Sequence, residues 1–255
     1  MAAPVQHILQ ELGFGIRRVG PEELHGQAAV TPEMCVPGTT ALRTSILAAW
    51  VDNVCGLLAV DVLGPRVPVT LELDVELERP LDDVERVHVV GRLLKAGRAV
   101  IVASADLTSD DGTPLGMGAA TFMPSPDESL RIPGTTDDLL ANRLRGDGPL
   151  LEVPLAERAG CRRASPGVAV FDRSDDGLNS SRTVNSGLIA LGVEEAALSL
   201  SPGSTLASLD IRYLQPIRVG PVVATAEVRG GLGRVDVRDE GNDDRLSVVA
   251  TTRTF

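Results

Sequence analysis

The chain is poor in the residues from which most metal and redox sites are built. Its 255 residues include only three histidines (His7, His25, His88) and three cysteines (Cys35, Cys55, Cys161). No CxxC pair and no metal-ligand spacing occurs among them, so the sequence indicates neither a zinc site nor a disulfide framework. We therefore expect no metal and no cofactor. Unpatterned thiols fit a reducing compartment, and we expect a cytoplasmic protein.

Basic side chains are scarce relative to acidic ones, and Lys95 is the only lysine. The 24 basic residues against 35 acidic ones give a net charge of −11, which argues against nucleic acid or an anionic membrane surface as the main partner. The first residues lack a basic region followed by an apolar run, so we expect no secretory signal. GxGxxG, Walker and GxSxG motifs are missing, which disfavours nucleotide-binding and α/β-hydrolase chemistry.

Aromatic residues make up only 2% of the chain although 43% of it is hydrophobic, so the core must consist mainly of Val, Leu, Ala and Ile. Such a core suits β-structure around helices. Two stretches, 37–60 and 179–200, each lead from a polar start into a run that is apolar on nearly every helical face, which predicts two buried helices. The first run is too short, and too interrupted by Asp52, to span a bilayer, and we expect no membrane partner.

Each apolar run contains carboxylates, Asp52 in the first and Glu194 and Glu195 in the second. A buried carboxylate is costly to leave charged, so its pKa rises unless a partner stabilises the charge. We interpret Asp52 as functional because it lies well inside its helix. The alternative, a solvated acid near a helix end, is the interpretation that we prefer for Glu195.

Alternating polar and apolar residues predict strands at 69–78, 84–94, 98–108 and 115–123, and again at 206–214, 222–229, 234–237 and 246–255. Shorter strands are expected at 27–31 and 168–171, before the two long helices, and short helices at 5–13 and 137–144. A constant offset of 136 positions separates several pairs of residues: Pro80 and Pro216, Gly97 and Gly233, Arg98 and Arg234. This offset indicates an internal duplication.

We therefore predict an α+β fold of two domains in tandem, each a long buried helix wrapped by an antiparallel sheet. The domains are expected at 1–123 and 156–255, joined by a proline-rich linker at 124–155. A long ordered loop inside one domain is the alternative, and it is uncommon at this length. The two sheets are expected to join edge to edge, with both helices on the same side.

This organisation resembles the hotdog fold, here in tandem, and its details resemble the acyl-CoA thioesterases of the phenylacetate-pathway (PaaI) type within the thioesterase superfamily. The motif of those enzymes is an asparagine, six residues, His-Gly-Gly, an apolar turn and a half, and an acid within Leu-Ala-Asp or Val-Asp-Asn. The second half of the chain has Asn179 at the asparagine and Glu194 at the acid. Asn185 stands where the histidine is usual, and Ser186 and Gly187 stand at the glycine pair.

The first half matches a different part of the same motif. Asp52 stands at the acid, within Val-Asp-Asn as in the family. Pro37 replaces the asparagine, Arg43 the histidine, and Thr44-Ser45 the glycine pair. Each half is thus defective in a different part, and the parts are complementary.

The resemblance implies hydrolysis of acyl-CoA thioesters by carboxylate-assisted water attack, or by a carboxylate nucleophile, with backbone amides polarising the thioester carbonyl. One working site is expected across the two halves, with Asp52, Thr70, Asn179 and Gly187 as catalytic residues and Asn185 and Ser186 as substrate-binding residues. Thr70 stands where a serine or threonine of the family often helps to hold the attacking water. In the second half that position is Leu206.

Structural interpretations of the same residues stay open. Asn179 is alternatively a turn residue, Gly187 a packing glycine, and Thr70 a surface residue on the polar face of its strand, two positions before Glu72. The mirror-image site would combine Glu194 with Pro37, Arg43 and Ser45. There we expect Arg43 to pair with Glu194 and to fix the interface between the domains.

A protein that binds or scaffolds acyl thioesters without hydrolysing them is the alternative function, because Arg43 and Asn185 depart from the family motif. The sequence does not define the length of the acyl chain. The phosphates of CoA would meet local arginines such as Arg98, Arg212, Arg218 or Arg234. Exposed sheet edges would also allow a homo-oligomer.

Overall fold

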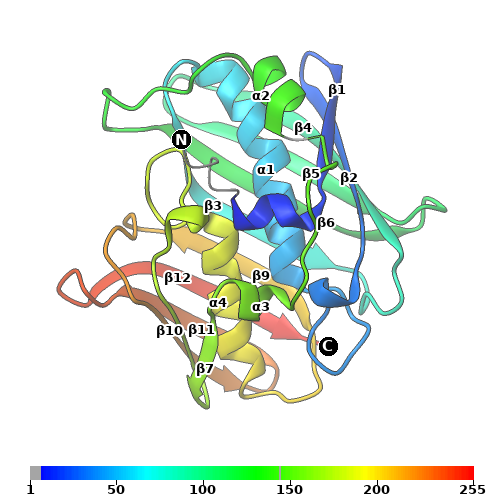
Figure 1. Ribbon diagram of the computed structural model, residues 1–255, viewed down its shortest axis with the longest axis vertical. Helices are drawn as coiled ribbons and strands as arrows, with labels where there is room; N and C mark the ends of the chain where they lie inside the picture. Colours follow the sequence, from blue (N-terminus) through cyan, green and yellow to red (C-terminus); the bar gives the residue numbers. More distant parts are fainter. Residues whose placement is uncertain (1–6, 144) are drawn as a thin grey trace.

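The computed structural model describes residues 7–143 and 145–255, whose twelve strands form one continuous antiparallel sheet (Figure 1). The strands follow the order β1-β2-β4-β5-β6-β3-β9-β12-β11-β10-β8-β7 across the sheet. The first half of the chain supplies β1 (Gly15–Gly20), β2 (Glu23–Ala29), β3 (Pro68–Leu77), β4 (Arg86–Ala96), β5 (Ile101–Thr108) and β6 (Pro114–Pro124). The second half supplies β7 (Arg162–Ser165), β8 (Val168–Phe171), β9 (Leu206–Tyr213), β10 (Val222–Arg229), β11 (Leu232–Asp239) and β12 (Arg245–Thr254).

Two long helices, α1 (Thr44–Leu63) and α4 (Ser186–Leu198), lie on the same face of this sheet and pack against each other (Figure 1). The α+β fold that we predicted, with two buried helices wrapped by antiparallel strands, is confirmed. The ten predicted strands are also present, although several of their ends differ by a few residues. The two strands that we missed, β1 and β7, form the outer edges of the sheet. Their sequences are largely polar, and β7 is exposed throughout, so neither shows the alternation that marks a half-buried strand.

The two halves of the sheet meet where β3 pairs with β9. Asp74 lies opposite Asp210, while Glu72 and Glu76 lie opposite Arg212 and Ser208. Asp210 follows Asp74 by the same 136 positions that relate the repeats, so a pseudo-twofold axis passes between these two aspartates. The predicted edge-to-edge joining of two sheets is confirmed, whereas the domain limits at 123 and 156 stay a prediction.

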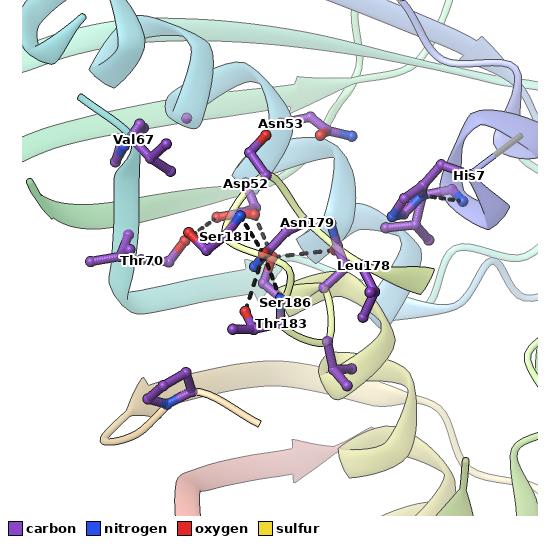
Figure 2. A pocket seen from close by; sticks show the side chains of 18 of the residues that line it. His7, Asp52, Asn53, Val67, Thr70, Leu178, Asn179, Ser181, Thr183 and Ser186 are labelled. Atoms are coloured by element: carbon purple, nitrogen blue, oxygen red, sulfur yellow. Dashed lines mark hydrogen bonds between the residues drawn. The ribbon is translucent and has the colours of Figure 1, made fainter. Parts of the chain in front are cut away.

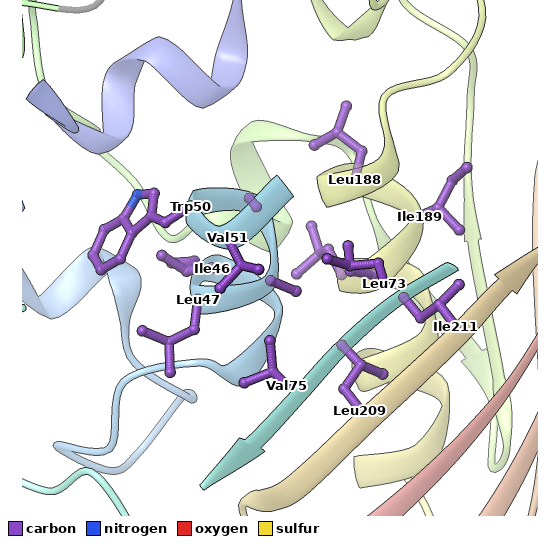
Figure 3. Packing of buried hydrophobic residues seen from close by; sticks show 14 of the residues in the cluster. Ile46, Leu47, Trp50, Val51, Leu73, Val75, Leu188, Ile189, Leu209 and Ile211 are labelled. Atoms are coloured by element: carbon purple, nitrogen blue, oxygen red, sulfur yellow. The ribbon is translucent and has the colours of Figure 1, made fainter. Parts of the chain in front are cut away.

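The hydrophobic core fills the space between the two helices and the central strands. Side chains of α1 and α4 meet those of β3 and β9 there, and Figure 3 labels Ile46, Leu47, Trp50, Val51, Leu73, Val75, Leu188, Ile189, Leu209 and Ile211. Complete burial of one such side chain stabilises the fold by about 1.5–3 kcal/mol. The absence of a polar face on either helix is explained, because α1 and α4 contact the sheet and each other.

The length of α1 corrects one expectation. The helix continues past Val60 to Leu63, and its 20 residues are long and apolar enough to cross a membrane by length and composition alone. However, 67% of its most apolar 18-residue stretch is buried inside the protein. The same test is passed by the core helix of a globular domain, and the wrapping of α1 by β2 to β6 accounts for its composition.

The segment between β6 and β7 lies on the helix side of the sheet and contains α2 (Thr136–Arg143) and α3 (Leu155–Arg158). α2 confirms the short helix expected near 137–144 up to residue 143, while residue 144 lies outside the described part of the chain. The Thr136 hydroxyl donates to the Leu57 carbonyl of α1 at 3.3 Å. Ile132, from the same segment, packs on Val60 and Val67 in a small apolar cluster. The helix expected at 5–13 is observed as a 3-10 helix, η1 (Ile8–Leu12), while residues 5 and 6 lie outside the described part of the chain.

Candidate active site

Asp52 lies at the centre of the candidate site, on the ninth residue of α1. Two hydroxyl groups donate to its carboxylate from different parts of the chain (Figure 2). The Thr70 Oγ1 of β3 donates to Oδ1 at 3.0 Å, and the Ser186 Oγ, at the start of α4, donates to Oδ2. The structure therefore brings together one acid and two hydroxyls that are separated by as many as 134 positions in the sequence.

Burial raises the pKa of the Asp52 carboxyl above its ordinary value, and the hydroxyl groups of Ser186 and Thr70 oppose this rise. The cause is loss of water around the charged form, which hydrogen bonds to the carboxylate compensate only in part. A carboxylate with a raised pKa is a better proton acceptor than an exposed aspartate. Its position is therefore suited to general-base chemistry.

A β-bulge turns Thr70 toward Asp52. Thr70 pairs with Phe122 and Glu72 pairs with Thr121, so Leu71 is an extra residue in β3. Such a residue reverses the alternation of side chains between the two faces of a sheet. The simple alternation that placed Thr70 on the same face as Glu72 was wrong for this reason.

The N-terminus of α4 supplies the second part of the site. Asn185 caps this helix, and its Oδ1 accepts the Gly187 N–H at 2.8 Å. Among the described residues, no protein acceptor binds the N–H of Ser186, the first residue of the helix. Free N–H groups and the positive end of the helix dipole favour negative charge at this position.

Tyr213, the only tyrosine of the chain, also belongs to the site, and we did not single it out from the sequence. Its hydroxyl donates to the Ser186 carbonyl at 3.3 Å. Burial raises the pKa of Tyr213 well above its usual value, and the nearby Asp52 charge adds to this rise. The signal was present in β9, where Leu209, Ile211 and Tyr213 follow one another at alternate positions on the inner face.

Asn179 organises the loop that precedes α4. Its Oδ1 accepts hydrogen bonds from the N–H of Ser181 at 2.9 Å, and from the N–H and Oγ1 of Thr183 at 3.2 and 3.1 Å (Figure 2). These bonds give Asn179 the turn-forming role that we considered as an alternative. The residue also lines the cavity beside Asp52, and its Oδ1 is occupied by these bonds within the loop.

Gly187 is explained by packing. A Cβ atom at this position would lie 2.7 Å from the Cβ of Ala49 and 2.8 Å from Cδ1 of Leu9, so the glycine allows α4 to approach α1 closely. Its N–H is already bound by Asn185, and it does not line the cavity. Of the six site residues expected from the sequence, the other five line one cavity: Asp52, Thr70, Asn179, Asn185 and Ser186.

This cavity has a volume of about 1140 Å³, slightly above the usual range for small-molecule sites. Its walls come from η1 and its flanks, α1, β3 and β6, the segment after β6, the loop before α4 with the start of that helix, and the end of β9 with the segment after it. Of the four arginines considered for CoA phosphates, only Arg218 lines it, while Arg212 and Arg234 pair with Asp210 and Asp236. Within residues 7–143 and 145–255, no group of His, Cys, Asp or Glu side chains is arranged to hold a metal ion.

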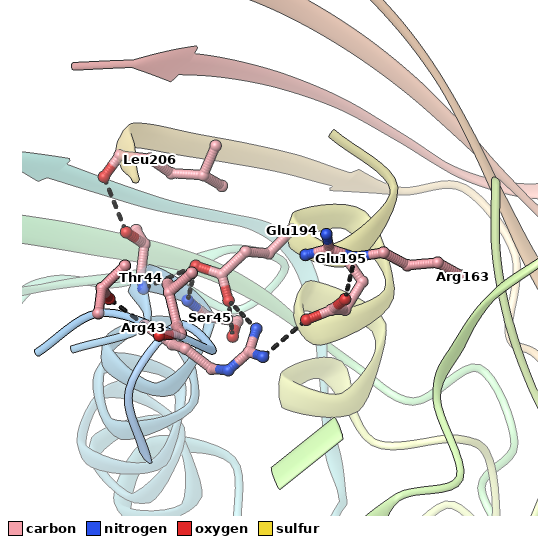
Figure 4. A network of polar contacts seen from close by, with 9 residues as sticks. Arg43, Thr44, Ser45, Arg163, Glu194, Glu195 and Leu206 are labelled. Carbon is pink, nitrogen blue, oxygen red and sulfur yellow. Dashed lines mark hydrogen bonds and ion pairs between the residues drawn. The ribbon is translucent and has the colours of Figure 1, made fainter. Parts of the chain in front are cut away.

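The pseudo-symmetric position is filled by protein atoms (Figure 4). Glu194 is the ninth residue of α4, as Asp52 is of α1, and its side chain is fully buried. Its carboxylate accepts the N–H groups of Thr44 and Ser45 at 2.9 and 3.4 Å, and the Ser45 Oγ at 2.6 Å. The Arg43 guanidinium lies 3.2 Å from the same carboxylate. The predicted ion pair between Arg43 and Glu194 is confirmed.

The interpretation of Glu195 as a solvated acid was wrong. Only 4% of this residue is exposed, and its carboxylate lies 2.7 Å from both the Arg43 and the Arg163 guanidinium groups. A buried charge is tolerated when it is paired in this way. The partners come from the start of α1 and from β7, so the sequence around Glu195 contains no sign of them.

Comparison with known proteins supports the fold and part of the functional expectation. Residues 45–115 match the model of the thioesterase superfamily, and no curated protein matches the chain. A 12:0-ACP thioesterase from Umbellularia californica is similar in structure, with 12% identity and a TM-score of 0.66 over 94% of this chain and 99% of that one. An acyl-ACP thioesterase from Bacteroides thetaiotaomicron is similar with 15% identity and a TM-score of 0.63, over 96% and 99% of the two chains.

These similarities establish the tandem hotdog fold along the whole chain and a thioesterase-superfamily signature in its first half. They are not specific to the PaaI type, to which the sequence motifs pointed. The two structures are acyl-ACP thioesterases, and at this level of identity they carry information on the fold alone.

Proposed function

We propose that this protein hydrolyses acyl thioesters at one site, formed by Asp52 of the first half and the N-terminus of α4 in the second. The observation that carries this proposal is the position of the Asp52 carboxylate. This carboxylate is partly buried in a large cavity and accepts hydrogen bonds from two hydroxyl groups. It also lies next to the N-terminus of a helix that has a free N–H group. A base and an oxyanion donor are the two parts that thioester hydrolysis needs.

In the proposed reaction, Asp52 accepts a proton from a water molecule that attacks the thioester carbonyl carbon. Negative charge then develops on the carbonyl oxygen, where the Ser186 N–H and the α4 dipole stabilise it. The carbon–sulfur bond breaks as this intermediate collapses, and the proton held by Asp52 passes to the departing thiolate. Thr70 and Ser186 keep the carboxylate oriented, and the Asn179 amide is available to the carbonyl oxygen or the water.

Acyl-CoA is the carrier that we propose, in a cytoplasmic setting, with Arg218, which lines the cavity, as a candidate for a phosphate contact. Acyl carrier protein, the carrier of the two similar structures, is the competing donor. One experiment separates them. Purified protein is given matched acyl-CoA and acyl-ACP substrates, release of free thiol is followed, and Asp52→Asn serves as the control.

A specific observation also favours the non-catalytic alternative. The Gly187 N–H is bound by Asn185 and the Asn179 oxygen is occupied by its own loop, so fewer donors and acceptors face the cavity than the family motif implies. An acyl-thioester binding protein would bind these substrates without releasing thiol above the rate of the Asp52→Asn protein. Titration calorimetry on the same substrates would identify that case.

A further inference from the structure

Gly56 is an unexplained glycine in the middle of α1, one turn after Asp52. A glycine inside a helix destabilises it relative to alanine, so its presence requires a reason. In α4 the reason is close packing. A Cβ on Gly187 would lie 2.7 Å from Ala49, and a Cβ on Gly192 would lie 3.0 Å from the Phe171 ring.

Packing does not explain Gly56. The nearest atoms to a Cβ built at this position are in the Phe122 ring, at 3.7 and 3.8 Å, which are ordinary van der Waals distances. An alanine would therefore fit without displacing any neighbour. What lies beside Gly56 is the cavity, which it lines together with Asp52 and Asn53 on the same side of α1. Within residues 44–60 these three are the only ones that are intermediate in exposure, while the others are buried.

The cavity becomes apolar in the direction of Gly56. Beside and beyond this residue most of the lining is apolar and includes Leu57, Val60, Val67, Val69, Phe122 and Ile132, while Ser125 and Asp127 of the segment after β6 are polar members of it. The passage ends where Val60, Val67 and Ile132 pack together, with Leu130 and Leu139 of the segment after β6 against them. On the other side of Asp52 the lining is more polar and includes His7, Gln10, Asp175 and Asp176. Figure 2 shows Val67 and His7 on opposite sides of Asp52.

We propose that Gly56 keeps open a passage for the acyl chain, which runs along α1 from the Asp52 carboxylate to the cluster of Val60, Val67 and Ile132. This inference rests on the proposed function and names its substrate class. Val60 lies eight residues after Asp52 on the same side of α1, which corresponds to about 12 Å along the helix axis at ~1.5 Å per residue. An extended alkyl chain with bonds of ~1.52 Å advances about 1.25 Å per carbon. The passage therefore fits an unbranched, apolar acyl group of about 8–10 carbons.

Two substitutions at opposite ends of the passage are expected to change chain-length preference in opposite directions. Gly56→Leu places a side chain one turn beyond Asp52 and should lower kcat/KM for decanoyl-CoA by about 10–200-fold, the range for a misfit in an apolar pocket. Hydrolysis of acetyl-CoA and butyryl-CoA should change little, because these chains end before the obstruction. Ile132→Ala should instead favour longer acyl chains, because it removes part of the wall that closes the passage.

Gly56→Ala is the matched control for folding. Alanine is the better helix former and meets no close neighbour, so this variant should unfold at a temperature equal to or above that of the native protein. The acyl-chain preference of Gly56→Ala should shift toward shorter chains, but less than the preference of Gly56→Leu. A reduction that is equal for all chain lengths in Gly56→Leu would overturn the passage, because it would indicate general damage to the site.

A binding measurement separates this inference from the proposed function. Free saturated fatty acids, from butyric to palmitic acid, are used to displace a fluorescent fatty acid from the native protein and from Gly56→Leu. If no thioester is hydrolysed but medium chains bind best, and Gly56→Leu loses them, the passage stands and the hydrolase proposal fails. If thioesters are hydrolysed without regard to chain length, the hydrolase stands and the passage is overturned. Neither hydrolysis nor binding would overturn both.

Discussion

Asp52→Asn and Glu194→Gln form a matched pair of substitutions. Both acids are the ninth residue of their helix, and each carboxylate binds groups at the N-terminus of the other helix. Each change removes a charge and keeps the size of the side chain. If only the Asp52 site is catalytic, the two variants should have opposite effects on activity and on stability.

Asp52→Asn removes the proposed base and should lower kcat by about 10²–10⁴-fold. Its effect on stability follows from the raised pKa. A carboxyl group whose pKa is higher in the folded protein contributes stability at low pH, and this contribution is lost as the pH rises through the folded pKa. Above that pKa the ionised Asp52 therefore opposes folding. The uncharged asparagine removes this opposition, so the variant should be at least as stable as the native protein.

Glu194→Gln acts on a pair of side chains that are both fully buried. Breaking a buried ion pair by removing one partner costs about 3–5 kcal/mol. In this variant Arg43 still has the Glu195 carboxylate as a partner, 2.7 Å from its guanidinium group. We therefore expect a loss at the lower end of that range, about 3 kcal/mol. A change of 1 kcal/mol shifts the unfolding temperature of a protein of this size by about 2–4 °C, so the loss should be about 6–12 °C. The kcat of the folded variant should be almost unchanged.

Steady-state kinetics on the best acyl thioester, together with thermal unfolding of the same samples, test this pair. The reasoning is refuted if Glu194→Gln is the inactive variant while Asp52→Asn keeps its activity. Comparable losses of kcat in the two variants would show that both sites work. An unchanged unfolding temperature in Glu194→Gln would mean that the buried network contributes no net stability.

Four further outcomes are expected. In pH profiles, kcat should rise with pH as Asp52 ionises, and Ser186→Ala should move that rise to higher pH, because it removes a donor that lowers the pKa of Asp52. Gly187→Ala places a Cβ atom 2.7 Å from the Cβ of Ala49 in α1, so it should lower the free energy of unfolding by about 1–3 kcal/mol in urea titrations, whereas Gly56→Ala should not. Burial raises the pKa of the Cys161 thiol to about 12, so it should react with a thiol reagent only after unfolding. Asp52→Glu should lose activity in the thiol-release assay although it keeps a carboxylate, because the longer side chain reaches the Ser186 N–H.

The helices and most strands could be predicted because their signals are local. α1 and α4 lack a polar face, and the inner residues of β3 alternate with its acidic outer ones. The polar edge strands β1 and β7 carry no such signal, since an edge strand with solvent on most sides has no need of alternation. Strand pairing at the pseudo-twofold axis followed from the repeat, which is a property of the whole sequence.

The sequence predicted the acid and the helix N-terminus of the candidate site, but it did not predict which residues contact one another there. The Leu71 bulge, which turns Thr70 inward, depends on pairing with β6 and leaves no mark in β3 itself. The partners of Glu195 and the packing of Gly187 come from elements that are distant in sequence. In each case a local pattern defined the type of side chain, and only tertiary contacts defined what it touches.

One methylene group contributes to the difference between the two pseudo-symmetric sites. Glu194 is long enough to reach the N–H groups of Thr44 and Ser45, so it occupies the end of α1 that corresponds to the proposed carbonyl-binding end of α4. Asp52 is shorter, and at the start of α4 it accepts a hydrogen bond from the Ser186 hydroxyl and none from the Ser186 N–H. In the proposed hydrolase only the Asp52 site is active. The other copy can then close its helix end with an internal carboxylate and hold the two halves together through Arg43.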